Sequence, residues 1–244
     1  MMNSSRLVKL LLSAWLCALC SPGRAAETAT EYKLLLAPAS WRAAAAAYKL
    51  NAPDKERDIY FYDTQDLALY ARGLVLRARA GKKKGDTTVK FRPPQGPVPA
   101  DVSAQDGFKC ENDATLSGAT KSCSLTAPRE PADIAAVAAG DRKPRHLFTG
   151  TQRAWAGEIW EGLRPLGPIK SFSWEVPHPA LDALAFERWD LPGGPSYYEV
   201  SFRASSGGEA GLSLLLKELA QLGIKPAARQ SSKTLAAMEF FSRP

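Results

Sequence analysis

At 244 residues with a formal net charge of +7, the chain is long enough for one large domain with a full core, and it is only mildly basic. Three of its 32 cationic residues lie in the first 26 positions, so the remainder holds 29 cations against 25 acids. No nucleic-acid-binding motif accompanies this charge. The composition therefore excludes nucleic acid as the expected partner.

The first 26 residues have the pattern of a secretory signal. Arg6 and Lys9 precede an apolar run over 10–19, which is too short to span a membrane, and small residues follow it. Cleavage is expected after Ala25 or Ala26. We therefore predict an exported protein, with a periplasm as the expected destination and no stable membrane insertion.

Beyond the signal, the chain has two cysteines, Cys110 and Cys123. An even pair in an exported chain predicts a disulfide, while two free thiols or a metal site are less favoured. His146 and His178 show no ligand spacing that would support a metal site. Lipid attachment at Cys20 is also less favoured, because a lipoprotein signal would need a small residue where this chain has leucine.

Apolar alternation and turn residues then predict a series of elements in chain order. They are a strand over 31–36, a helix over 40–48, an aromatic strand from Asp58, a short helix closed by Gly73, two cationic strands, a loop over 95–107, a hairpin over 108–125, helices over 131–140 and 151–160, strands over 169–176, 184–191 and 197–203, and helices over 211–222 and 231–241. Trp155 and Ile159 are expected to form the packing face of the helix over 151–160. The series indicates a mixed α+β fold with a mostly antiparallel sheet.

The two cationic strands hold the most informative pattern. Arg77 and Arg79 lie two residues apart in the first strand, and Lys90 and Arg92 lie two apart in the second. Side chains two apart on a strand share a face, and the intervening turn Gly-Lys-Lys-Lys-Gly-Asp suits a hairpin. The hairpin therefore presents at least three fixed positive charges on one surface, which either faces water or holds a polyanion.

This region resembles the CYTH domain, also called the triphosphate tunnel metalloenzyme family. The family pattern runs YFDT, spaced leucines before a glycine, LRxR and TxK. The matching segments here are 60–64, 67–73, 76–79 and 88–90, with 186–189, 198–201 and 231–234 resembling later strands and the SKT signature. The resemblance implies an α+β fold: a mostly antiparallel, eight-stranded, tunnel-like β-barrel with peripheral helices. It covers a single domain over 27–244, with the disulfide in an insertion at about 93–128.

In the family, inward-facing cations grip a triphosphate and glutamates hold a divalent metal. Carried over to this sequence, the resemblance implies phosphate binding by Arg77, Arg79, Lys90 and Lys233, Mg²⁺ or Mn²⁺ binding by Glu31, Glu187 and Glu199, and a catalytic role for Lys33 in orienting the attacking water or the terminal phosphoryl group. Guanidinium groups suit phosphate oxygens, and hard carboxylate oxygens suit these metals. Lys82–Lys84 are expected to be solvated turn residues.

The acidic part of the pattern is incomplete. Ala29 and Ser201 stand where the family has glutamates, and Phe172 stands where it has an arginine two residues after a lysine. Glu31 and Glu199 are also consistent with simple charge compensation of the two arginines.

We therefore predict binding of triphosphate, polyphosphate or another phosphorylated polyanion, with weak or no hydrolysis. A metal-dependent triphosphatase or polyphosphatase is the first alternative, and an exported scaffold that binds nothing is the second. Adenylate cyclase activity, which also occurs in the family, is least favoured, because an exported chain meets little ATP.

Overall fold

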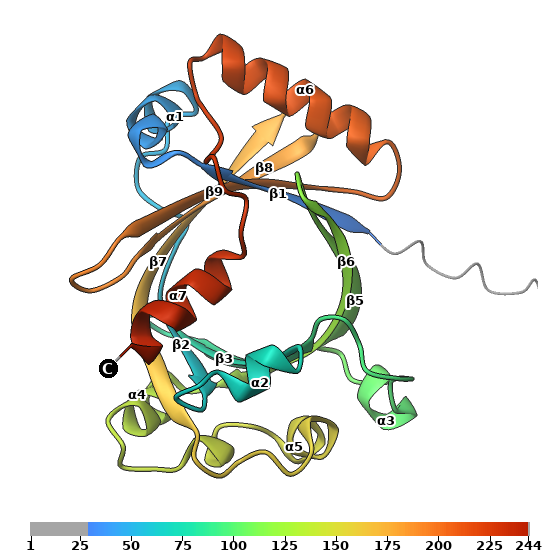
Figure 1. Cartoon of the computed structure of the whole chain (residues 1–244), viewed down its shortest axis with the longest axis vertical. Helices are drawn as coiled ribbons and strands as arrows, with labels where there is room; N and C mark the ends of the chain where they lie inside the picture. Colours follow the sequence, from blue (N-terminus) through green and yellow to red (C-terminus); the bar gives the residue numbers. More distant parts are fainter. Residues whose placement is uncertain (1–28, 244) are drawn as a thin grey trace, which may run out of the picture.

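The computed structural model describes residues 29–243; the predicted signal lies outside them. A closed barrel of nine strands forms the molecule's centre (Figure 1). The strands are β1 (Thr30–Leu36), β2 (Lys55–Asp63), β3 (Leu74–Ala80), β4 (Gly85–Phe91), β5 (Phe108–Thr115), β6 (Gly118–Arg129), β7 (Arg164–His178), β8 (Asp182–Asp190) and β9 (Ser196–Ala204). Their order around the barrel is β1-β5-β6-β4-β3-β2-β7-β8-β9. The predicted α+β fold class is confirmed.

The strand count differs from the eight strands expected. The hairpin of β5 and β6 belongs to the barrel wall, where β6 pairs with β4 and β5 pairs with β1. The segment around 93–128 thus supplies two barrel strands. The β1–β5 contact is parallel and only three residue pairs long, whereas the other neighbouring strands are antiparallel. This short seam closes the barrel.

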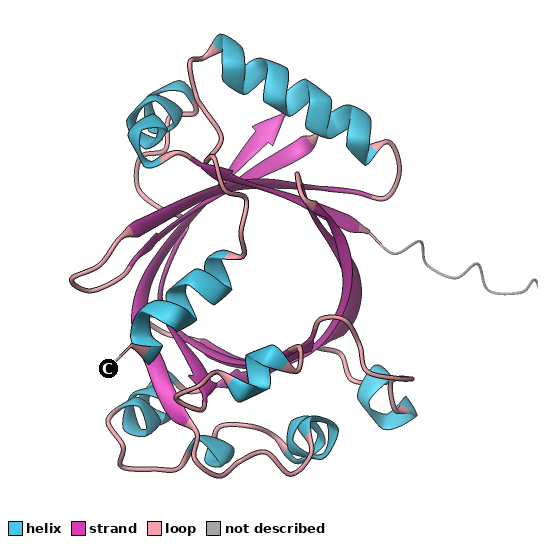
Figure 2. Cartoon of the chain, in the orientation of Figure 1, coloured by secondary structure: helices cyan, strands magenta, loops and turns pink. Residues whose placement is uncertain are grey.

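The helices lie outside the strands or near their ends (Figure 2). They are α1 (Trp41–Ala47), α2 (Ala68–Ala71), α3 (Ala100–Ser103), α4 (Pro131–Ala138), α5 (Gly150–Ala156), α6 (Gly208–Gln221) and α7 (Lys233–Ser242), with single 3-10 turns at Pro38–Ser40 and Pro144–His146. Within residues 29–243, no helix has the length and apolar character needed to cross a bilayer.

Two predictions about the helical regions were wrong. The helix expected to reach residue 160 ends at Ala156, because Gly157 adopts a positive φ of 83°. Ile159 therefore lies beyond the helix, although it packs in the same apolar cluster as Trp155. The region over 95–107, expected as a loop, contains the single turn α3.

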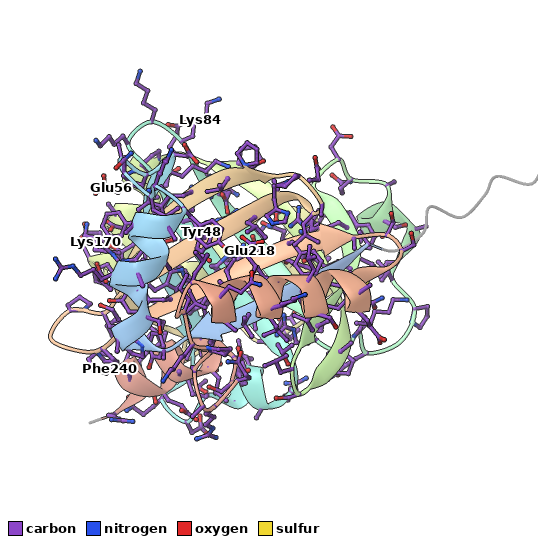
Figure 3. The ribbon with its side chains drawn as sticks, turned by 90° about the horizontal axis from the view of Figure 1, so that it is seen from above. Tyr48, Glu56, Lys84, Lys170, Glu218 and Phe240 are labelled. Atoms are coloured by element: carbon purple, nitrogen blue, oxygen red, sulfur yellow. A yellow bond between two sulfur atoms is a disulfide. The ribbon has the colours of Figure 1, made fainter. Side chains whose placement is uncertain are left out.

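The strands separate an apolar outer layer from a polar interior. In β3, Leu76 and Ala78 are fully buried against the outer helices, while Arg77 and Arg79 face the barrel cavity. This is the period-two alternation of a strand that is covered on both faces. In contrast, Lys84 in the β3–β4 turn points away from the barrel into solvent, as expected for that turn (Figure 3).

The turn after β2 positions the cationic hairpin. Asp63 is fully buried, and its carboxylate accepts hydrogen bonds from the backbone N–H groups of Leu69 and Tyr70, both at 2.9 Å. Gly73 follows with a φ of 76°, and a Cβ there would lie 2.6 Å from the carbonyl oxygen of Arg92. In this structure Asp63 and Gly73 therefore fix the path of the backbone between β2 and β3.

The predicted disulfide is confirmed. Cys110 and Cys123 face each other across β5 and β6 with their Cα atoms 4.0 Å apart. Since Glu111 points into the barrel, the neighbouring Cys110 lies on the outer face of β5.

Replacing both cysteines by alanine should lower the free energy of unfolding by about 3 kcal/mol, because the bond constrains the unfolded chain. Chemical denaturation of the oxidised, reduced and double-alanine forms checks this. The reduced wild type should match the alanine variant. Equal stability of all three forms would contradict the prediction.

Candidate binding site in the barrel interior

A cavity of about 550 Å³ occupies the barrel interior. Its wall carries ten cations and four carboxylates: Lys33, Lys55, Arg57, Arg77, Arg79, Lys90, Arg92, Lys109, Arg203 and Lys233, with Glu31, Glu111, Glu187 and Glu199. Serine and threonine hydroxyls from β4, β6, β7 and β9 fill other positions on the wall. This excess of positive charge, held among buried walls, favours an anionic ligand.

The structure brings all eight charged residues proposed from the sequence to this one cavity: Lys33, Arg77, Arg79, Lys90, Lys233, Glu31, Glu187 and Glu199. Sequence reasoning did not assign Lys55, Arg57, Lys109, Glu111 and Arg203 to the site. Lys55 and Arg57 on β2, and Lys109 and Glu111 on β5, have the same spacing of two as Arg77 and Arg79. This spacing was the feature of the sequence that could have assigned these four residues to the inner face of the barrel.

Arg77 is a cavity cation without a carboxylate partner in the described part of the chain. Its Nε atom is buried without a hydrogen bond, and its Nη2 atom donates only a long bond of 3.4 Å to the Thr88 hydroxyl. Among residues 29–243, no carboxylate forms a salt bridge with it. Burial and then the neighbouring Arg79 lower the pKa of Arg77 to about 10, which still leaves it charged at neutral pH. A buried, charged and partly unsatisfied guanidinium is suited to an external anion.

Arg79, in contrast, has an internal counter-ion. Its Nε atom donates to Asp86 at 2.9 Å, and Arg57 approaches the same carboxylate at 3.7 Å. Asp86 thus partly neutralises the charge of two arginines, Arg57 and Arg79.

The idea that Glu31 and Glu199 compensate the arginine pair of β3 is not supported by the ion pairs. Glu31 lies 3.0 Å from Lys33, and Glu199 lies 3.0 Å from Lys233.

The three glutamates expected to bind a metal, Glu31, Glu187 and Glu199, belong to two separate groups of side chains. Glu187 and Glu199 face each other across β8 and β9, and Lys233 at the start of α7 contacts both carboxylates. Burial would raise the pKa of Glu187, but Lys233, followed by hydrogen bonds from Trp189 and Ser171, lowers it to about 2. This pair therefore has an internal cation where the sequence analysis expected a metal.

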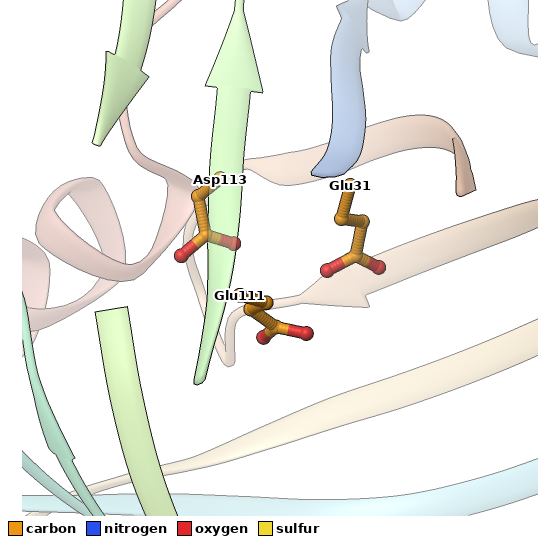
Figure 4. A group of neighbouring side chains, drawn as sticks. All are labelled: Glu31, Glu111 and Asp113. Carbon is orange, nitrogen blue, oxygen red and sulfur yellow. The ribbon is translucent and has the colours of Figure 1, made fainter. Parts of the chain in front are cut away.

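Glu31 belongs to a second acidic cluster, with Glu111 and Asp113 (Figure 4). One carboxylate oxygen from each lies within 4.8 Å of the others, because β1 and β5 are paired at Glu31 and Asp113. Three hard oxygen donors fit the chemistry of Mg²⁺ or Mn²⁺. The same carboxylates, however, also form ion pairs with Lys33, Lys90 and Lys109.

The fold and the cavity together define a closed β-barrel with a charged, cation-rich interior. Solved structures of the same architecture exist. One is a protein from Hippeastrum, described as a candidate adenylyl cyclase with a dominant triphosphatase activity. Its sequence is 18% identical, its TM-score is 0.62, and the match covers 85% of this chain and 93% of that chain. Another is a candidate adenylate cyclase from Bacillus halodurans, 15% identical with a TM-score of 0.56, over 86% of this chain and 97% of that chain.

At these identities the likeness concerns the fold alone. It agrees with the tunnel-like barrel that the resemblance to the CYTH family implied. No family model matches the sequence. No curated protein matches it either.

Proposed function

We propose that the barrel binds a triphosphate, a polyphosphate or another phosphorylated polyanion, with weak or no hydrolysis. The observation that carries this proposal is Arg77, whose Nε atom is buried and which has no carboxylate partner among residues 29–243, in a cavity with ten cations and four acids on its wall. A cavity of about 550 Å³ is also within the usual range for small-molecule sites. The triphosphatase activity described for the Hippeastrum protein supports this ligand class.

Each cation has a role in this proposal. Arg77 and Arg79 present planar forks to phosphate oxygens, and Lys90 and Lys233 supply point charges at other parts of the wall. Burial would lower the pKa of Lys33, but Glu31, Glu199 and Asp113 raise it above its ordinary value. Lys33 is therefore a permanent cation that can orient a terminal phosphoryl group and cannot serve as a general base.

Metal-dependent hydrolysis of triphosphate or polyphosphate remains the second candidate function, and the acidic cluster favours it. Glu31, Glu111 and Asp113 would hold the Mg²⁺ or Mn²⁺ ion. A metal bound there would polarise the phosphoryl group under attack. A scaffold with no ligand is the third, and the lack of a salt bridge from Arg77 to any carboxylate in the described part of the chain argues against it.

Thermal melting of the oxidised protein tests the proposal. Inorganic tripolyphosphate at about 100 times its Kd should stabilise the fold by about 2.7 kcal/mol, or about 5–10 °C. Sodium sulfate at matched ionic strength controls for general salt effects, and phosphate release is assayed with Mg²⁺ and with EDTA. Metal-dependent release would make the protein an enzyme. If tripolyphosphate does not raise the melting temperature, either with Mg²⁺ or with EDTA, polyanion binding is refuted.

We also propose that the protein is exported and acts in a periplasm. The apolar segment over 10–19 and the disulfide between Cys110 and Cys123 support this location. Intact-mass measurement of protein secreted by a Gram-negative host tests it. Retention of the first 25 residues in the mature product would contradict export by this signal.

A further inference from the structure

Asp113 on β5 is the centre of a buried ion-pair cluster. Its side chain is 3% exposed. One carboxylate oxygen lies 2.5 Å from the Lys33 ammonium, while the other accepts from Lys90 at 2.9 Å, from the Ser122 hydroxyl at 2.8 Å and from the Arg92 guanidinium. Three of these four donors share one carboxylate oxygen, and Lys33 contacts the other. Asp113 therefore acts here as a counter-anion of three cations.

The same three cations also line the main cavity. Lys33, Lys90 and Arg92 form part of the wall of the 550 Å³ cavity, whereas Asp113 lines a second cavity of about 220 Å³. Lys33 and Arg92 line both spaces. Asp113 is two residues from Glu111 on β5, so it lies on the same inner face of the barrel and holds the charged ends of these cations near the β1–β5 seam.

The cations of the site consequently differ in what they offer to an anion. Arg77 has no carboxylate partner within the described part of the chain. Lys33, Lys90 and Arg92, in contrast, each already contact one oxygen of Asp113. Burial would raise the pKa of Asp113, but its three cations hold it well below the ordinary range, so the carboxylate stays charged at any ordinary pH.

We propose that Asp113 is an internal counter-anion that competes with the ligand, so that a phosphorylated ligand must displace it from Lys33, Lys90 and Arg92 in order to bind these three cations. The inference rests on the proposed polyanion binding. It adds that Asp113 sets the affinity of the site and its preference for phosphate chains over single phosphates. A single phosphate group can pair with Arg77 without displacing Asp113. A chain of several phosphates can contact Arg77 and the three other cations together, and these added contacts offset the displacement of Asp113.

Asp113→Asn removes the competing charge and keeps the shape of the side chain. We expect it to tighten binding of inorganic tripolyphosphate about tenfold in metal-free buffer with EDTA, because a buried negative charge near the ligand is lost. Binding of orthophosphate should change less. Asp58→Asn is the matched control: Asp58 pairs with Lys170 at 2.6 Å outside the cavity, and the variant changes the net charge equally.

Titration calorimetry on the full oxidised protein distinguishes the outcomes. Tighter binding by Asp113→Asn and not by Asp58→Asn supports the inference. Equal or weaker binding by Asp113→Asn, with normal binding by the wild type, overturns the inference and leaves the proposed function standing. Absence of binding in every form overturns both. Binding by Asp113→Asn alone supports the competing carboxylate and shows that the wild type does not bind the probe.

A second measurement does not depend on the variant. In a crystal structure of the wild type with tripolyphosphate and EDTA, the Lys90–Asp113 and Lys33–Asp113 distances should lengthen beyond 4 Å as the ammonium groups turn to the ligand. Retention of the distances of 2.9 Å and 2.5 Å beside a bound ligand would refute displacement of Asp113.

Discussion

Replacing Arg77 by methionine should weaken tripolyphosphate binding by about 30- to 100-fold, because a charge-assisted hydrogen bond in a buried site contributes about 2–3 kcal/mol. The same change should raise the stability of the ligand-free protein. Arg77 is half-buried, its Nε atom is buried without a partner, and no carboxylate of the described chain pairs with it. Methionine fills a similar volume without the desolvation cost, so we expect a gain of about 1–3 kcal/mol.

Arg79→Met is the matched control on the same strand. Arg79 also faces the cavity, so this variant should lose ligand affinity as well. Its Nε atom, however, donates to Asp86 at 2.9 Å, and its removal leaves Asp86 with only Arg57 at 3.7 Å. Arg79→Met should therefore lower the melting temperature where Arg77→Met raises it. Calorimetric titration and thermal melting of both variants separate ligand binding from folding.

A loss of stability in Arg77→Met together with unchanged affinity would contradict the assignment. In that case the guanidinium would support the fold and would not contribute to the site.

The largest loss of stability is expected for Lys233→Met. This side chain is buried at the start of α7, contacts Glu187, lies 3.0 Å from Glu199 and covers the ring of Trp189 at 4.5 Å. Its removal leaves two neighbouring carboxylates in the barrel without their shared cation. Breaking such a buried cluster costs about 3–5 kcal/mol, which for a domain of this size is about 6–20 °C in Tm.

Lys217→Met on the exposed face of α6 is the control, since it makes the same chemical change without a buried partner. Adding Glu187→Gln to Lys233→Met should recover part of the lost stability by removing one of the two like charges. Thermal melting of the three variants checks this. If the two lysine variants melt at the same temperature, Lys233 is not the counter-ion that the ion pairs indicate.

The pH dependence of stability follows from the same cluster. The pKa of Glu187 falls from 4.5 to about 2 on folding, so its contribution is complete above about pH 4.5 and is lost as the pH falls through about 2. The pKa of Lys233 is raised, so its contribution is complete below about 10.5 and is lost above the folded value. In Lys233→Met we expect the pH dependence from Glu187 to reverse, because burial without the lysine makes this carboxylate bind a proton more readily in the folded state than in the unfolded state. The difference in Tm between wild type and Lys233→Met should therefore shrink between pH 6 and pH 3.

Local sequence was sufficient to predict most strands and eight of the fourteen charged residues on the cavity wall. The spacing of Arg77 and Arg79, with Leu76 and Ala78 between them, predicts one charged and one apolar face whatever the strand pairs with. The helix predicted to reach residue 160 failed because the glycine at 157 ends it. The apolar spacing of Trp155 and Ile159 is compatible with a helix and also with the packed turn that the structure shows.

The sequence by itself determined which charges share the inner face, because a strand's period of two is a local property of the backbone. The tertiary structure alone decided which charges neutralise each other, since this depends on strand order and register. Lys33 and Asp113 are 80 residues apart and meet only because β5 joins β1 at the seam; Lys233 and Glu187 meet only because α7 packs on the barrel. The same alternation of charge is compatible with many ion pairs, and only the tertiary structure shows that Arg77 forms none with a carboxylate of residues 29–243.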